Sequence, residues 1–158
     1  MERGQIMNIC VYDHRSGADV ATKNCINEIR KVFDIIRWNR QTTTVRQFRG
    51  KIMAELKKLG WSDQVTLDRE VKITITSMRE QIGLCMQTGN WSRIYADLLK
   101  LQALYVKGTI KGGVIIIPTI ACGLTFGKNI ASCERLEREL QYFNQVITMP
   151  IAVLGFYD

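Results

Sequence analysis

The sequence has 158 residues, of which 46% are hydrophobic and 23% are charged, and its formal net charge is +7 at pH 7. These values are typical of a globular protein and argue against a disordered chain, and the length predicts one domain over residues 1–158. The apolar runs are far too short to span a bilayer and the first residues lack the apolar core of a signal peptide, so we expect a soluble cytoplasmic protein without membrane contact.

The positive charge is concentrated in the first part of the chain. Residues 1–60 carry 12 Lys and Arg against 6 Asp and Glu, whereas residues 61–158 carry 10 against 9. Cationic side chains displace counterions from a phosphate backbone, so a basic half favours a polyanionic partner. A charge that only keeps the protein in solution is the alternative.

Patterns of established catalytic sites are scarce. His14 is the only histidine, and its neighbours YDHRSG are more typical of a turn than of a catalytic base. No Gly-rich segment has the spacing of a phosphate-binding loop. The cysteines are odd in number and lack CxxC spacing, so we interpret most of them as buried structural thiols; they are Cys10, Cys25, Cys85, Cys122 and Cys133.

Two helices are predicted in the basic part. Residues 18–38 and 45–61 carry apolar side chains three and four positions apart, and Gly60 is a suitable stop for the second helix. Several cations lie in and around the polar loop between them, where they can contact a phosphate backbone or form a solvated corner. The residues we predict to bind nucleic acid are Arg37, Arg40, Arg46, Arg49 and Lys51.

A hairpin is predicted next. Residues 70–78, EVKITITSM, alternate apolar and polar side chains, as expected of a strand, and residues 82–87, IGLCMQ, form a second short apolar run. The link between them is so short that the two strands should be antiparallel. Side chains two apart on a strand point the same way, so Cys85 and Gln87 should share a face.

The remaining elements predict the fold class. Asn90 is a suitable N-cap for a helix over residues 91–108, whose apolar side chains suit either complete burial or contact with a second subunit. Residues 112–119 and 149–156 read as buried strands, with a helix over 131–143 between them. The order predicts an α/β fold with a mixed central sheet flanked by helices.

Four segments of the chain resemble the BglII-like type II restriction endonucleases, which belong to the PD-(D/E)XK nuclease fold. They are VYDHRSGAD from residue 11, AELKKLGW from residue 54, the stretch from IGLCMQTGN to GGVIII over residues 82–117, and NIASCERLERELQYFNQVITMPIAVLGF from residue 129. The resemblance implies a restriction-endonuclease-like core, with a helical basic part in residues 1–60 and the core sheet and helices in residues 61–158.

The resemblance also implies a site. In this family an aspartate and a glutamate on the hairpin strands hold Mg²⁺, which polarises the scissile phosphate and activates a water, and a glutamine stands two residues after the glutamate. Gln87, followed by TGN, falls on that glutamine. Cys85 falls on the glutamate and Thr76 on the aspartate. Gln64 occupies the approximate position of a further polar residue.

Both metal-binding acids are therefore replaced. A hydroxyl and a neutral thiol cannot substitute for two carboxylate ligands of Mg²⁺, so we predict no metal site and no cofactor, with Mg²⁺ bound only if the protein is active. Neighbouring acids that could supply a ligand are Asp68, Glu80 and Glu55.

Three functions are compatible with these residues. The one we favour is a DNA-binding protein on a restriction endonuclease scaffold, catalytically impaired because Thr76 and Cys85 replace the acids. The others are an active Mg²⁺-dependent endonuclease with a substituted site, and an interaction or regulatory protein that touches no nucleic acid. We expect double-stranded DNA as partner and a homodimer, since enzymes that cut palindromes match site symmetry with two subunits.

Overall fold

A five-stranded mixed sheet forms the centre of the computed structural model, which describes residues 4–158. The strands are β2 (Asn8–His14), β6 (Ser77–Arg79), β7 (Ile82–Met86), β8 (Gly112–Pro118) and β9 (Ile151–Tyr157). In the order β2-β9-β8-β7-β6, the three inner strands are parallel and each edge strand is antiparallel to its neighbour. The predicted α/β fold with a mixed sheet is confirmed.

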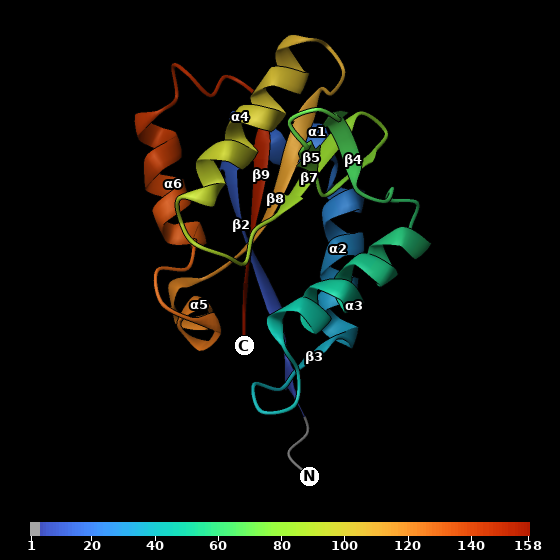
Figure 1. Cartoon of the computed structure of the whole chain (residues 1–158), viewed down its shortest axis with the longest axis vertical. Coiled ribbons are helices and arrows are strands. Elements are labelled where there is room, and N and C mark those ends of the chain that lie inside the picture. Colours follow the sequence, from blue (N-terminus) through green and yellow to red (C-terminus); the bar gives the residue numbers. More distant parts are fainter. Residues whose placement is uncertain (1–3) are drawn as a thin grey trace.

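Helices cover both faces of this sheet (Figure 1). On one face lie α1 (Gly17–Ala21), α2 (Lys23–Ile35) and α3 (Val45–Lys58), and on the other α4 (Arg93–Val106) and α6 (Cys133–Tyr142). The short helix α5 (Ile120–Phe126) follows β8 and packs with the first group. No helix in residues 4–158 is long and apolar enough to cross a membrane.

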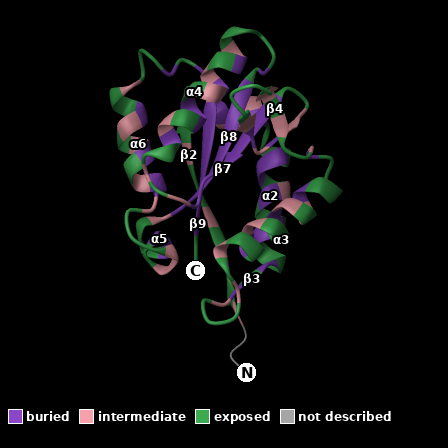
Figure 2. Ribbon diagram, in the orientation of Figure 1, coloured by how far each residue is buried: buried purple, intermediate pink, exposed green. Residues whose placement is uncertain are grey.

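The inner strands β7, β8 and β9 are buried almost throughout, because helices pack on both of their faces (Figure 2). Side chains alternate between the two faces: Leu84 and Met86 join the cluster under α2 and α3, and Cys85 joins the cluster under α4 and α6. Four of the five cysteines are buried, as predicted for most of them, and Cys10 is exposed.

The region of the predicted hairpin is divided. Residues 70–78 do not form one strand: β5 (Ile73–Ile75) pairs with β4 (Val65–Asp68) in a separate ribbon, and β6 pairs with β7 in the central sheet. The division falls at Thr76, whose Oγ1 accepts a 3.0 Å hydrogen bond from the Met86 backbone N–H in place of a strand carbonyl. The antiparallel arrangement of the second part with β7 is confirmed.

Strand β2 and helix α5 were not predicted from the sequence. β2 is an edge strand with several exposed positions, so its sequence NICVYDH shows no clear apolar alternation. His14 ends this strand instead of lying in a turn, and its buried Nε2 is 2.8 Å from the Ile147 carbonyl oxygen.

The helix predicted over 18–38 is interrupted at Thr22 and stops before a short ribbon of β3 (Arg37–Trp38) with β1 (Gln5–Ile6).

Candidate functional site

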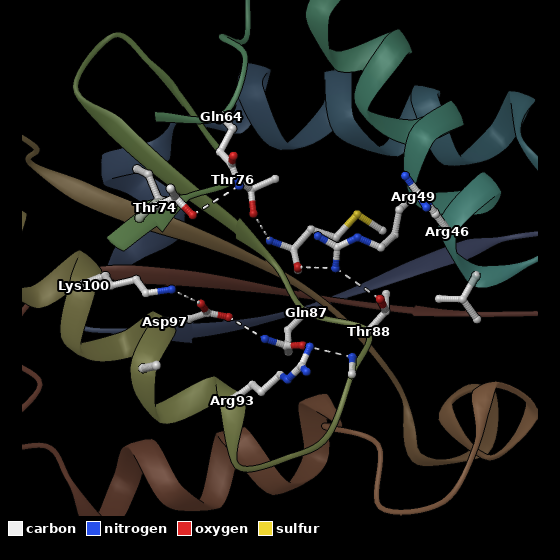
Figure 3. Close-up of a pocket in the computed structure, with 15 residues that line it drawn as sticks. Arg46, Arg49, Gln64, Thr74, Thr76, Gln87, Thr88, Arg93, Asp97 and Lys100 are labelled. Carbon is white, nitrogen blue, oxygen red and sulfur yellow. Dashed lines mark hydrogen bonds and ion pairs between the residues drawn. The ribbon is translucent and has the colours of Figure 1, made fainter. Parts of the chain in front are cut away.

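An open cleft of about 550 Å³ lies between α3, the β4–β5 ribbon, the carboxyl end of β7 and the first turns of α4 (Figure 3). Its polar and charged lining residues are Arg46, Arg49, Gln64, Thr74, Thr76, Gln87, Thr88, Arg93, Asp97 and Lys100. A second hollow of about 380 Å³ shares Arg49, Gln64 and Thr76 with it and extends along α3 to Lys57. The two hollows together form one groove along α3.

The cleft brings together three of the four residues that the resemblance singled out. Gln64, Thr76 and Gln87 line it, although they come from the start of the ribbon, from the residue between β5 and β6, and from the end of β7. Gln64 Nε2 donates a 3.2 Å hydrogen bond to Thr74 Oγ1 across the ribbon. The Thr76 hydroxyl is held against the backbone of β7.

Cys85 does not line the cleft. Its side chain is 1% exposed and lies in the apolar cluster under α4. Burial, with the nearby carboxylate of Asp97 adding to it, raises the pKa of the Cys85 thiol to about 12. The thiol is therefore neutral at physiological pH and provides no thiolate that could coordinate a metal ion.

Gln87 connects the cleft to helix α4. Its Nε2 donates a 2.7 Å hydrogen bond to Asp97 Oδ2, and its Oε1 accepts a 2.9 Å hydrogen bond from the Gly89 backbone N–H. The other Asp97 oxygen, Oδ1, is 3.3 Å from Lys100 Nζ. Asp97 was not predicted from the sequence, although an acid beside Ile94 and Leu98 on the apolar stripe of a helix signals a buried carboxylate with a partner.

Arg49 is fixed at the end of β7. The capping box of Thr44 and Gln47 sets the start of α3, so that Phe48 faces the core and Arg49 faces the cleft. Arg49 Nη1 donates to the Met86 carbonyl oxygen at 2.8 Å and to Thr88 Oγ1 at 3.1 Å. Burial lowers the pKa of the Arg49 guanidinium, and Asp97 opposes that shift. The guanidinium keeps its charge because an arginine pKa starts so high.

Only two of the five cations predicted to bind nucleic acid line the cleft, namely Arg46 and Arg49. Arg37 donates from the short strand β3 to backbone carbonyls of Asp34 and Ile36, and the exposed Arg40 and Lys51 line neither hollow. Three further cations, Arg93, Lys100 and Lys57, were missed. Arg93 lies three residues after the end of the TGN turn, at the start of the following helix, and this position is the signal that could have found it.

The cleft does not fit a hard divalent cation such as Mg²⁺. Asp97 is the one carboxylate among its described lining residues, and both of its oxygens are engaged by neighbours. Of the other acids considered, Glu55 pairs with Lys58 and Asp68 accepts hydrogen bonds from the turn after β4. Glu80 lies in the β6–β7 turn. Within residues 4–158 no three His, Cys, Asp or Glu side chains are grouped to hold a metal.

Comparison with known proteins identifies relatives of this fold. The family model described as restriction endonuclease BglII/BglIII matches residues 9–156. The crystal structure of restriction endonuclease BglII complexed with a DNA 16-mer is similar with a TM-score of 0.74 and 12% identity, over 94% of this chain and 75% of that one. The crystal structure of free BglII is similar with a TM-score of 0.63 and 14% identity, over 96% and 80% of the two chains. A comparison with curated proteins found no match.

Proposed function

Because this chain belongs to the restriction endonuclease BglII/BglIII family, we propose that it is a DNA-binding protein that holds duplex DNA in the cleft without cleaving it. The observation that carries the proposal is the charge of the cleft. Four cationic side chains and one carboxylate line it among the described residues. Such a surface attracts a polyanion, whereas a metal-dependent nuclease site needs acids that hold a cation.

The groove along α3 supports the same proposal. Arg46 and Arg49 lie three residues apart on the cleft side of the helix, whereas Lys57 in the second hollow is paired with Asp63 at 2.7 Å. Two arginines on one side of a helix suit contacts with phosphates of a DNA strand. The similar BglII structure with a DNA 16-mer adds support, because that protein binds DNA on a scaffold with the same fold.

The lack of cleavage follows from the two replaced acids. Water attack on a phosphodiester at a useful rate depends, in this kind of site, on a metal that polarises the phosphate and activates the water. Thr76 offers a hydroxyl that is already held by the backbone of β7, and Cys85 offers a buried neutral thiol. Neither side chain supplies the negative charge that a metal requires.

The test combines binding and cleavage. A fluorescently labelled duplex should bind at low salt, with an affinity that falls steeply as salt rises, by a logarithmic slope of about 0.9 for each phosphate neutralised. Supercoiled plasmid incubated with excess protein and Mg²⁺ or Mn²⁺ should stay intact. Nicked or linear plasmid would instead favour an active endonuclease, and undetectable binding at low salt would favour a protein that contacts no nucleic acid.

We also propose that two copies pair through the outer face of α4. Leu99 and Val106, seven residues apart on this face, are 60% and 73% exposed, which leaves two large apolar side chains without a partner in the described chain. Light scattering should then give twice the 18.1 kDa mass of one chain. Leu99→Asp with Val106→Asp should give monomers, and Ile35→Asp, at a 62% exposed site on α2, should not. A wild-type monomer at every concentration tested would refute the pairing.

A further inference from the structure

The cations of the cleft are not equally free to take a ligand. Lys100 lies 3.3 Å from the Asp97 carboxylate, so these two charges offset each other. Arg46, Arg49 and Arg93 remain, and within residues 4–158 no ion pair involves any of their guanidinium groups. Three arginine charges therefore face the cleft without a protein anion bound directly to them.

Arg49 is already oriented. Its Nη1 is held by the Met86 carbonyl oxygen and by Thr88 Oγ1, while no hydrogen bond from its Nε or Nη2 lies within the described residues. A guanidinium has five N–H donors in a rigid fork, so most of this fork is free to donate. A half-buried guanidinium loses part of its hydration, and this costs free energy unless an anion compensates the charge. An anion can reach Arg49 from the cleft, which this side chain lines.

Arg93 approaches from the other side of the same strand end. Figure 3 shows Arg49 extending from α3 and Arg93 from the start of α4, with Gln87 and Thr88 between them. Arg93 lies against Gly89, since a Cβ at residue 89 would be in ordinary contact with Arg93 Cδ and Nη1 at 3.5 Å, and it would crowd Gln87 Oε1 at 3.1 Å. Gln87 is held by Asp97, so the strand end between the two arginines is fixed.

We propose that one phosphate group binds between Arg49 and Arg93 without any metal ion, the two guanidinium groups supplying the positive charge that Mg²⁺ supplies in a metal-dependent nuclease. The inference rests on the proposed function, in which the phosphate is a phosphodiester of the DNA backbone. Two guanidinium groups carry the same charge as one divalent ion and donate hydrogen bonds in addition. They neither activate a water nor lower its pKa, so the phosphodiester is held and not hydrolysed.

The first test is metal dependence. Binding of a labelled duplex should have the same dissociation constant in EDTA and in Mg²⁺ at matched ionic strength.

Arg93→Gln should weaken binding about tenfold, the loss expected for one charge-assisted contact, and should lower the salt slope by about one. Arg138→Gln, an exposed arginine on α6 that lines neither hollow, removes the same charge and should change affinity by less than about twofold.

Arg93→Gln is the decisive variant, because the described structure gives its guanidinium no hydrogen bond to lose. Arg49→Gln should weaken binding as well, but it also frees the Met86 carbonyl oxygen and needs a check of folding by circular dichroism. Binding that disappears in EDTA, or an Arg93→Gln variant that binds like Arg138→Gln, would overturn the inference while leaving DNA binding intact.

A second arm separates DNA from free phosphate as the source of the ligand. Inorganic phosphate should raise the melting temperature of the wild-type protein more than chloride does at equal ionic strength, and Arg93→Gln should abolish the difference. If phosphate stabilises the protein in this way and no duplex binds, the proposed function fails and the site takes free phosphate. If a duplex binds and phosphate has no more effect than chloride, the phosphate site fails and the proposed function stands.

Discussion

The Gln87 side chain donates a 2.7 Å hydrogen bond from Nε2 to Asp97 Oδ2, which ties the end of β7 to helix α4 inside the cleft. Both partners are buried, with Gln87 7% and Asp97 9% exposed. The carboxylate that lines the cleft is thus used to hold the glutamine, and Lys100 completes its contacts. Because both oxygens of Asp97 are occupied in this way, the cleft contains a carboxylate but has no free carboxylate oxygen to bind a metal ion.

Removing Asp97 should destabilise the protein measurably. Asp97→Ala leaves the buried Gln87 amide without its acceptor, and an unmet buried donor costs about 1–3 kcal/mol in the free energy of unfolding. Asp97→Asn keeps an oxygen that can accept the same bond, so it should cost less. Urea denaturation of the three proteins measures the difference, and equal stabilities of Asp97→Ala and the wild type would show that the bond contributes nothing.

Alkaline pH should destabilise the protein partly through Cys85. Burial raises the pKa of this thiol from an ordinary value of 9.0 to about 12 in the folded chain. Between these values the unfolded chain releases its thiol proton and the folded chain retains it, so the free energy of unfolding falls as pH rises from about 9 towards 12. One thiol contributes a slope of at most about 1.4 kcal/mol per pH unit.

The measurement compares Cys85→Ala with the wild type by urea denaturation from pH 8 to 10.5. The variant lacks the titrating thiol, so its stability should fall less steeply above pH 9, although its stability at pH 8 is lower because a small cavity is created. Parallel curves for the two proteins would contradict the raised pKa of Cys85.

The fold and the side of the cleft that carries Thr76 and Gln87 could be predicted from the sequence, because both depend on local patterns. Buried inner strands carry continuous apolar runs, and the short link before Ile82 requires an antiparallel partner. The separation of residues 73–79 into two strands could not be read in this way. Ser77 breaks the alternation of residues 71–76, but that break does not show that two strands belong to different sheets, since the division depends on a hydrogen bond from the Met86 backbone N–H to Thr76.

The cation set of the cleft was harder to predict, because it is assembled from distant segments. Charge in residues 1–60 pointed to five cations, but the rotation of α3 decides that Arg46 and Arg49 face the cleft. Arg93 belongs to the less basic part of the chain and reaches the cleft only because β7 and α4 are consecutive. Net charge along a sequence therefore indicates an anionic partner better than it indicates the residues that meet it.

Gly155 should be intolerant of a side chain, because two sulfurs occupy the space above it. A Cβ at this position would lie 2.5 Å from Cys133 Sγ and 2.8 Å from Cys10 Sγ, both shorter than a van der Waals contact. Gly155→Ala should therefore cost about 1–3 kcal/mol of stability through overpacking. In a Cys10→Ala and Cys133→Ala background the sulfurs are absent and the same substitution should cost less. Additive effects in this double-mutant cycle would mean that the sulfurs do not set the cost.

Restoring the two acids should create a metal site if the family positions of Thr76 and Cys85 are right. Thr76→Asp retains an acceptor for the Met86 N–H, and Cys85→Glu adds a carboxylate on the face that carries Gln87. Wild-type protein should show no Mn²⁺ affinity by calorimetry, whereas the double variant should bind one Mn²⁺, and Thr76→Asn with Cys85→Gln serves as the uncharged control. Cys85 is buried, so a new carboxylate there can unfold the chain, and circular dichroism of the double variant must match that of the wild type before its metal affinity is compared. A folded double variant without any metal affinity would show that these two positions do not correspond to the family's acids.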